Sequence, residues 1–132
     1  MKRTFFSLAL LLAVATLTAQ TKMTAREAAV KIADRILAST TYEFKNTKTG
    51  EIYKSVKKLP LDMDVKVACK YNNWHYTNGV TNMALMELGD KLGDKKYEKY
   101  VLKNMNFVFN EGNLDFFRKQ YDEAFKRDGW NA

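Results

Sequence analysis

The fold of this chain is decided by residues 80–109, which read VTNMALMELGDKLGDKKYEKYVLKNMNFVF. Residues in the first half of this stretch recur at the spacing of one helix face: Val80, Met83, Ala84, Glu87, Leu88 and Leu92. The pattern predicts a helix from about residue 78 to residue 92. Gly93 suits the left-handed backbone that commonly follows a helix C-terminus, and Asp94 is a favourable N-cap for a second helix.

That second helix is predicted to follow at once and to end near Asn110. Its apolar face consists of Tyr97, Tyr100, Val101, Met105, Val108 and Phe109. Two helices joined by so short a connection pack as antiparallel neighbours, so the sequence predicts a helical hairpin. Its apolar faces are wide and rich in aromatic residues, with few other elements to cover them. We therefore expect the first part of a larger, all-α domain.

Of the residues before the hairpin, the first part has a clear helical pattern and the second part has none. Thr24-Ala25-Arg26-Glu27 fits a capping box, and the apolar residues behind it predict a helix over residues 24–39. Residues 41–73 have no sustained period, although residues 42–53 can form a small β-hairpin around a polar turn.

After the hairpin, Glu111-Gly112-Asn113 is expected to break the chain. A last helix should then run to about Lys126. It is outlined by Leu114, Phe117, Tyr121 and Phe125.

Residues 1–20 have the layout of a secretory signal peptide. Lys2 and Arg3 form a positive start, residues 5–15 are apolar, and Thr18-Ala19-Gln20 offers small residues for cleavage. The apolar run is shorter than the roughly 20 residues that span a bilayer. We therefore expect a secreted or periplasmic protein whose mature part, residues 21–132, is not held in a membrane.

Charge and composition exclude several classes of function. The chain has 22 basic and 15 acidic residues; without Lys2 and Arg3 the balance is 20 to 15, or +5. The positive residues alternate with acids and form no basic stripe, so we expect no nucleic-acid partner. Cys69 is the only cysteine and His75 the only histidine, so neither a disulfide nor a zinc site is expected, and no cofactor is indicated.

The stretch just before the hairpin, Trp74-His75-Tyr76-Thr77-Asn78-Gly79, is the best candidate for a binding site. Trp74 and Tyr76 offer flat faces for a pyranose ring, His75 a hydrogen-bond donor, and Gly79 room for close approach of the backbone. The alternative is that Trp74 and Tyr76 only cover the top of the helix pair. From the residues alone, both interpretations stay open.

The Trp74 stretch and the hairpin together resemble a known family. Residues 74–80, 84–89 and 92–101, with Trp-x-Tyr-x-x-Gly ahead of Gly-Asp-x-x-Tyr, are similar to the opening of the unsaturated rhamnogalacturonyl hydrolases and unsaturated glucuronyl hydrolases. The resemblance covers residues 24–126. It implies that residues 21–132 are the N-terminal portion of a glycoside hydrolase domain, the first helical hairpins of an (α/α)6 toroid.

The resemblance also implies an activity and a partner. These enzymes act on oligosaccharides with a terminal unsaturated uronic acid, the lyase products of pectin: an aspartic acid protonates the C4=C5 double bond and water adds at C5. Neither of the family's essential aspartates matches a residue here, so the catalytic residues stay unassigned and this chain alone is expected to be inactive. The other candidates for a catalytic carboxyl group are Asp122, Asp62 and Asp64, and all three are better explained as solvated or capping residues.

Two functions of another class remain as alternatives. A helical-repeat binding module would show a second Gly-Asp-x-x-Tyr about 34 residues away, and the sequence has none there. A free-standing helical protein that binds acidic glycans without catalysis agrees with the mild positive charge.

Overall fold

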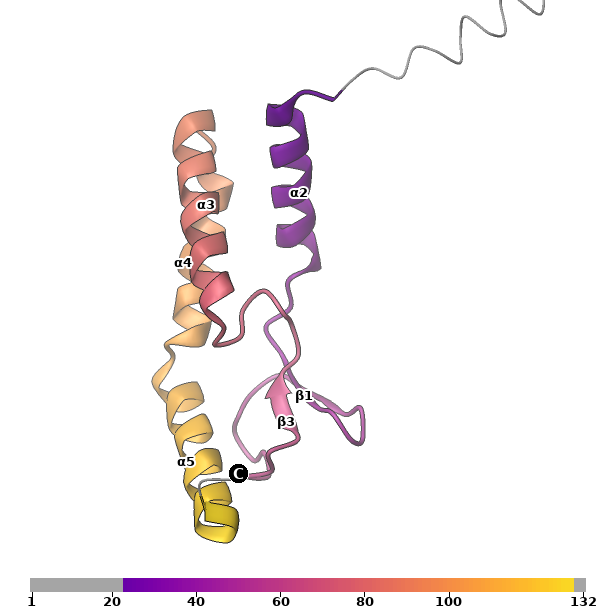
Figure 1. The fold of residues 1–132 in the computed structure, drawn as a ribbon, viewed down its shortest axis with the longest axis vertical. Coiled ribbons are helices and arrows are strands. Elements are labelled where there is room, and N and C mark those ends of the chain that lie inside the picture. Colours follow the sequence, from indigo (N-terminus) through magenta and orange to yellow (C-terminus); the bar gives the residue numbers. More distant parts are fainter. Residues whose placement is uncertain (1–22, 130–132) are drawn as a thin grey trace, which may run out of the picture. The chain divides into compact units, whose positions relative to one another are not determined.

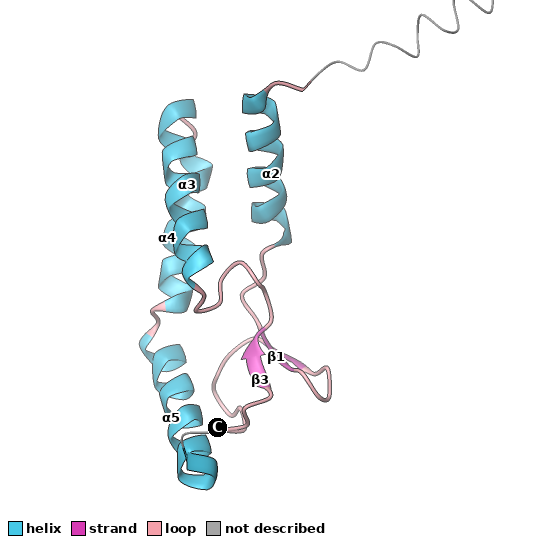
Figure 2. Cartoon of the chain, viewed as in Figure 1, coloured by secondary structure: helices cyan, strands magenta, loops and turns pink. Residues whose placement is uncertain are grey.

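The computed structural model describes residues 23–129, and the proposed signal peptide lies outside them. The described part is mostly helical, at 61% helix, with a small three-stranded sheet. The helices are α2 (Ala25–Ser39), α3 (Tyr76–Leu92), α4 (Lys95–Val108) and α5 (Glu111–Asp128). The strands are β1 (Phe44–Asn46), β2 (Ile52–Tyr53) and β3 (Val65–Val67) (Figure 2).

The chain divides into two compact units, Met1–Lys31 and Ile32–Ala132, each described by itself. In the first, the predicted capping box at the start of α2 is confirmed. The Glu27 carboxylate accepts a hydrogen bond from the Thr24 backbone at 2.8 Å, and the Thr24 hydroxyl accepts one from the Glu27 backbone at 3.2 Å. Two backbone N–H groups that the first turn leaves unpaired are satisfied in this way.

In the second unit, α3 and α4 form the predicted antiparallel hairpin and lie side by side (Figure 1). Gly93 adopts a left-handed φ of 66° at the end of α3. The Asp94 carboxylate accepts a hydrogen bond from the Lys96 backbone at 3.0 Å and caps α4. Both end signals of the sequence are confirmed, because each depends on local backbone chemistry alone.

One hydrophobic cluster holds this hairpin against the second half of α2. Its buried members are Ala33, Leu85, Tyr97, Tyr100 and Val101. Tyr97 is fully buried, and its hydroxyl donates a hydrogen bond of 2.9 Å to the Asp34 carboxylate. The Lys96 ammonium lies 2.8 Å from the same oxygen. These two contacts, that of Lys96 first, hold the pKa of Asp34 below its ordinary 3.8.

The all-α expectation is met in part, because the described residues are mostly helical but also form a small sheet. Phe44 pairs with Tyr53 in an antiparallel hairpin, which confirms the small hairpin expected over residues 42–53. On its other side Phe44 pairs with Val67 of β3, a strand that the sequence analysis does not predict. A second hydrophobic cluster, with Phe44, Val65 and Phe116 buried, joins this sheet to α5.

The buried faces of α3 and α5 differ from the predicted ones. Leu88 and Leu92 pack against the first cluster as expected, but Val80 is 60% exposed and Met83 74% exposed. In α5 the predicted face is displaced by one residue. The buried residues of the two helices are Asn78, Asn82, Leu85 and Gly89 in α3, and Asn113, Phe116, Gln120 and Ala124 in α5.

The expected break at residues 111–113 is also wrong. Asn110 caps α5, because its side-chain oxygen accepts hydrogen bonds from the backbones of Gly112 at 3.0 Å and Asn113 at 3.3 Å. The chain therefore passes from α4 to α5 through two residues, Phe109 and Asn110. Asparagine and glycine signal a turn, and here that turn is the helix cap itself.

Replacing Phe44 with alanine tests the second cluster. Removal of a fully buried phenylalanine should lower the free energy of unfolding by about 3–5 kcal/mol, measured by denaturant titration. Ile52→Ala is the matched control on β2, where the side chain is 48% exposed; it should cost about 0.5 kcal/mol or less. Equal losses in the two variants would contradict this account of the sheet.

The contacts of Asp34 with Tyr97 and Lys96 predict that stability depends on pH. Because the pKa of Asp34 is lower in the folded chain than in the unfolded chain, its contribution is complete above the unfolded pKa of about 3.9. It is lost as the pH falls through the folded value. Asp34→Asn should therefore be less stable than the unchanged chain near neutral pH, and the gap should shrink below about pH 4. A gap that is constant with pH would refute the assignment.

Candidate functional site

The Trp74 stretch forms the turn that begins α3. His75 is the N-cap of this helix, in an extended backbone conformation with φ −102° and ψ 136°. Its ring Nδ1 lies 2.8 Å from the Thr77 hydroxyl and 3.4 Å from the Thr77 backbone nitrogen. The ring therefore holds the first turn of α3, and the residues on either side of it are placed at the helix entrance.

The aromatic rings at this entrance are accessible. Trp74 is 56% exposed and Tyr76 78% exposed. The Tyr76 ring lies beside His75, with centroids 4.9 Å apart, and the Trp74 ring meets Phe109 edge-on at 5.9 Å. Both side chains therefore pack on a neighbouring ring and keep surface that a ligand can reach.

All four residues predicted for the site line one groove of about 230 Å³, here called the Trp74 groove. Trp74, His75, Tyr76 and Gly79 form it together with residues that come mainly from α3 and the end of α4. The remaining lining residues are Asn73, Asn78, Asn82, Met105, Val108 and Phe109. The volume is below the roughly 300–1,000 Å³ of pockets for drug-sized ligands, which suits a ligand unit of one ring.

Buried side-chain amides fix the backbone that carries these rings. Asn78 donates hydrogen bonds of 3.0 Å to the carbonyls of both Lys70 and Asn73. Asn104 of α4 donates one of 3.0 Å to the Tyr71 carbonyl. With both helices bonded to the preceding loop, the loop and the start of α3 are held in one arrangement.

Two further hollows adjoin the Trp74 groove. The His75 hollow, of about 410 Å³, is lined by Lys70, Tyr71, Asn73, His75, Thr77, Asn78 and Thr81. The α5 groove, of about 450 Å³, is lined by Trp74, Glu111, Leu114, Asp115, Phe117, Arg118 and Tyr121. His75 is shared by the first hollow and the Trp74 groove, and Trp74 by the Trp74 groove and the α5 groove.

The His75 hollow and the α5 groove differ in their charges. The first turn of α3 contains no acidic residue, and Lys70 lines the His75 hollow, so the positive end of the helix dipole is not offset there. In the α5 groove, Arg118 lies 2.6 Å from Asp115, which is also 2.7 Å from Lys119. These cations, Lys119 first, lower the pKa of Asp115.

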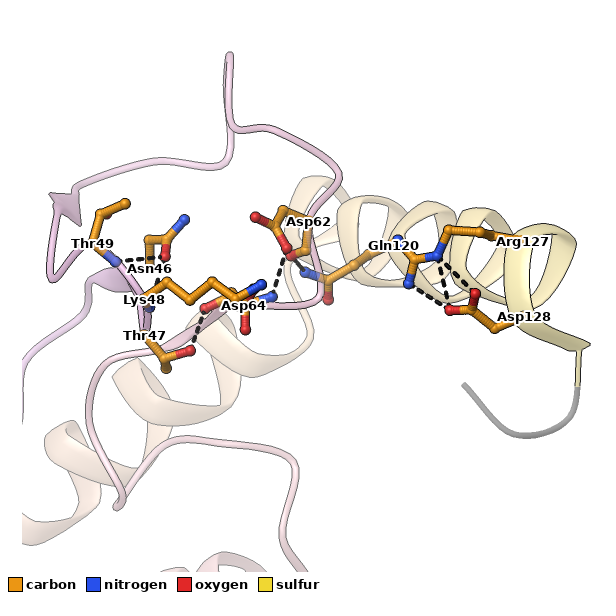
Figure 3. Close-up of polar contacts among 9 residues, drawn as sticks. All are labelled: Asn46, Thr47, Lys48, Thr49, Asp62, Asp64, Gln120, Arg127 and Asp128. Atoms are coloured by element: carbon orange, nitrogen blue, oxygen red, sulfur yellow. Dashed lines mark hydrogen bonds and ion pairs between the residues drawn. The ribbon is translucent and has the colours of Figure 1, made fainter.

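The acids considered from the sequence lie elsewhere. The Asp62 carboxylate accepts a hydrogen bond from the Asp64 backbone at 3.0 Å, and Asp64 pairs with Lys48 at 2.5 Å (Figure 3). Gln120 of α5 reaches the Asp62 carbonyl in the same view. Both acids thus shape a loop, as expected, and Asp122 is exposed on α5. None of the three lines the Trp74 groove.

Cys69 is buried, and its sulfur contacts backbone atoms of Ser39 and Tyr71. Over residues 23–129, no group of three His, Cys, Asp or Glu side chains is placed to hold a metal ion. None of the helices in the same range is both long and apolar enough to cross a membrane.

Comparison with known proteins assigns no family to this chain. No family model, no curated protein and no solved structure matches it. The resemblance to the unsaturated uronyl hydrolases therefore stays a prediction.

Sequence reasoning missed several residues of the site. Phe109 belongs to the apolar face predicted for α4, yet it is 59% exposed and contacts Trp74. Its position next to Asn110, the cap of α5, could have indicated this exposure. A residue at the end of a helix need not lie on the buried face that the helix period predicts. Tyr121 and Arg118 are more than 40 positions from Trp74, and no local pattern connects them to it.

Asn78→Ala tests whether the amides hold the loop. The variant leaves the carbonyls of Lys70 and Asn73 without this donor, so it should lower the free energy of unfolding by about 1–3 kcal/mol. With Trp130 replaced by phenylalanine throughout, it should also lower the fluorescence anisotropy of Trp74. Asn106→Ala, at an exposed position of α4, is the matched control: it should raise the free energy of unfolding by about 0.5 kcal/mol through the helix propensity of alanine and leave the anisotropy unchanged. Unchanged anisotropy in Asn78→Ala would contradict a fixed loop.

Proposed function

We propose that this chain forms part of the substrate site of a secreted hydrolase that acts on unsaturated uronyl oligosaccharides, the lyase products of pectin and rhamnogalacturonan. In this proposal α3 and α4 are one hairpin of an (α/α)6 toroid, and the Trp74 groove lies at its mouth. The enzyme class comes from the resemblance of residues 24–126 to the unsaturated uronyl hydrolases.

The single observation that supports the proposal is the Trp74 groove. Trp74, His75, Tyr76 and Gly79 line it together, with the two large aromatic rings accessible to solvent. The apolar C–H face of a pyranose packs well on such rings, and the amides and imidazole nearby can pair with its hydroxyls. The fixed backbone below them lowers the entropic cost of binding.

The charges favour one orientation of the ligand. An unsaturated uronic acid carries a carboxylate, and the His75 hollow offers Lys70, the Thr77 hydroxyl and the start of α3. An anion near a helix N-terminus is stabilised by the positive end of the helix dipole. The uronate therefore binds with its carboxylate toward this hollow and its ring at Trp74.

The reaction needs a carboxyl group that protonates C4 and then activates the water that adds at C5. Neither the Trp74 groove nor the His75 hollow has an aspartate or glutamate among its lining residues. The same observation favours a second candidate, a secreted module that binds acidic glycans without catalysis. In both cases the chain itself binds the sugar and does not convert it.

Binding is tested by fluorescence with Trp130 replaced by phenylalanine, so that Trp74 is the only tryptophan. Titration with an unsaturated galacturonyl–rhamnose disaccharide should shift the Trp74 emission. Tyr76→Ala in the same background should weaken binding about tenfold, or about 1.4 kcal/mol. Leu102→Ala, exposed on α4 and outside all three hollows, should leave the affinity unchanged. No saturable shift would remove the basis of the proposal.

Catalysis has a separate test. Hydration of the conjugated C4=C5 bond abolishes its ultraviolet absorbance. When this chain is mixed with the disaccharide, the chain should bind it and the absorbance of the disaccharide should not fall. Loss of absorbance that depends on the chain would show that it carries its own catalytic acid, and would overturn the view that it only binds the sugar.

A further inference from the structure

The solvent face of the sheet carries positive charge that no linear pattern of the sequence shows. Lys45 of β1 lies directly opposite Lys66 of β3 and, on its other side, directly opposite Ile52 of β2. All three side chains are exposed, whereas the alternate residues Phe44 and Val65 are buried in the second hydrophobic cluster. Lys66 follows Lys45 by 21 positions, so only the strand register makes them neighbours.

These two lysines repel one another. Residues directly opposite in an antiparallel pair have Cβ atoms about 4.5–5.5 Å apart, and like charges at such positions destabilise a sheet. Over residues 23–129, neither the Lys45 nor the Lys66 ammonium takes part in an ion pair. An anion bound to both offsets their repulsion, so the pair favours a negatively charged partner.

More positive charge lies beside this pair. Lys54 is exposed directly after β2, and Lys57 and Lys58 are exposed in the loop that follows. Val56 and Leu59 of this loop pack against the second cluster, which holds the loop beside the sheet. We call these five lysines and the apolar residue among them the lysine surface: Lys45, Lys54, Lys57, Lys58, Lys66 and Ile52.

The acids of this region offset its charge only in part. Residues 43–67 contain six lysines and four acids, a balance of +2. Two of the acids, Asp62 and Asp64, act on Lys48, which is not part of the lysine surface. Asp64 lies 2.5 Å from the Lys48 ammonium, and its attraction to Lys66 is weaker. The excess positive charge therefore belongs to the lysine surface.

The type of cation and the exposed isoleucine select the partner. Between Arg35 and Arg118 the side chains with a permanent positive charge are all lysines. Lysine is a hydrated point charge, whereas bidentate recognition of a single carboxylate or phosphate uses arginine. Ile52 is 48% exposed next to Lys45 and gains nothing from a polar polymer. At a lipid surface, an apolar side chain enters the boundary with the acyl chains while lysine stems extend to the headgroups.

We propose that the lysine surface docks this chain on an anionic phospholipid bilayer, with the ammonium groups at the lipid phosphates and Ile52 at the edge of the acyl region. The contact is with the lipid surface only, because no helix within residues 23–129 is both long and apolar enough to cross a membrane. The inference goes beyond the proposed function, since none of these residues lines the Trp74 groove.

The test is co-sedimentation of the chain, purified after export, with vesicles of phosphatidylcholine and phosphatidylglycerol or of phosphatidylcholine alone. We expect binding to the anionic vesicles that weakens as salt is added. Lys45→Gln with Lys66→Gln should weaken it about twentyfold, at about fivefold for each lysine. This variant should be no less stable than the unchanged chain, because it removes a pair of like charges.

Two matched variants complete the experiment. Lys31→Gln with Lys99→Gln makes the same change in net charge at exposed positions of α2 and α4, and should leave the affinity unchanged. Ile52→Ala should weaken binding to anionic vesicles about fivefold and leave binding to dextran sulfate, a polyanion without lipid, unchanged.

Three results would overturn the proposal. Equal binding to both kinds of vesicle would show that anionic lipid is not recognised. Equal weakening by the two double variants would show that net charge acts without the lysine surface. If Ile52→Ala leaves vesicle binding unchanged while the Lys45 and Lys66 substitutions abolish binding to dextran sulfate, the partner is a soluble polyanion and not a membrane.

Discussion

The hydrogen bonds of the Asn78 side chain are the interaction on which the rest of the site depends. Its Nδ2 donates to the backbone carbonyls of Lys70 and Asn73, and to the Asn73 side chain at 2.6 Å. These bonds join the first turn of α3 to the loop that enters it. That junction lies three residues from the His75 cap, and Asn78 itself lines the Trp74 groove. Without this amide, the carbonyls of Lys70 and Asn73 would lose a hydrogen-bond donor.

The same constraint explains why α3 and α5 bury amides where the sequence favoured apolar residues. The segment between α2 and α3 is largely irregular, so many of its carbonyls lack partners within a sheet or helix. Helix side chains supply the missing donors. Asn104 bonds to the Tyr71 carbonyl of that segment, and Gln120 bonds to its Val65 carbonyl at 2.9 Å. Asn113 serves a different carbonyl, that of Phe107 in the last turn of α4, at 2.8 Å. Because the amides face inward, Val80, Met83 and Tyr121 are left at the surface.

The helix ends could be predicted from the sequence because they depend on neighbouring residues. Strand β3 could not, because it depends on pairing with a distant residue. The caps at Thr24, Gly93 and Asp94 depend on a few adjacent atoms, and the structure has them where the sequence places them. β3 exists only because Phe44 pairs with Val67, 23 positions away, so its own three residues carry no sufficient signal. The α5 face shifted for a related reason: periodicity gives the spacing of a face but not which polar residues the neighbouring loop requires.

The candidate site follows the same division. Trp74, His75, Tyr76 and Gly79 are neighbours in sequence, so one helix start brings them together, whereas Phe109 reaches Trp74 only through the turn between α4 and α5. The start of α3 has no acidic residue to offset the positive end of its helix dipole, whereas the α5 groove contains Glu111 and Asp115 beside Arg118. The electrostatic environment therefore changes along α3 and α5, from a helix start that favours negative charge to a groove that already contains it.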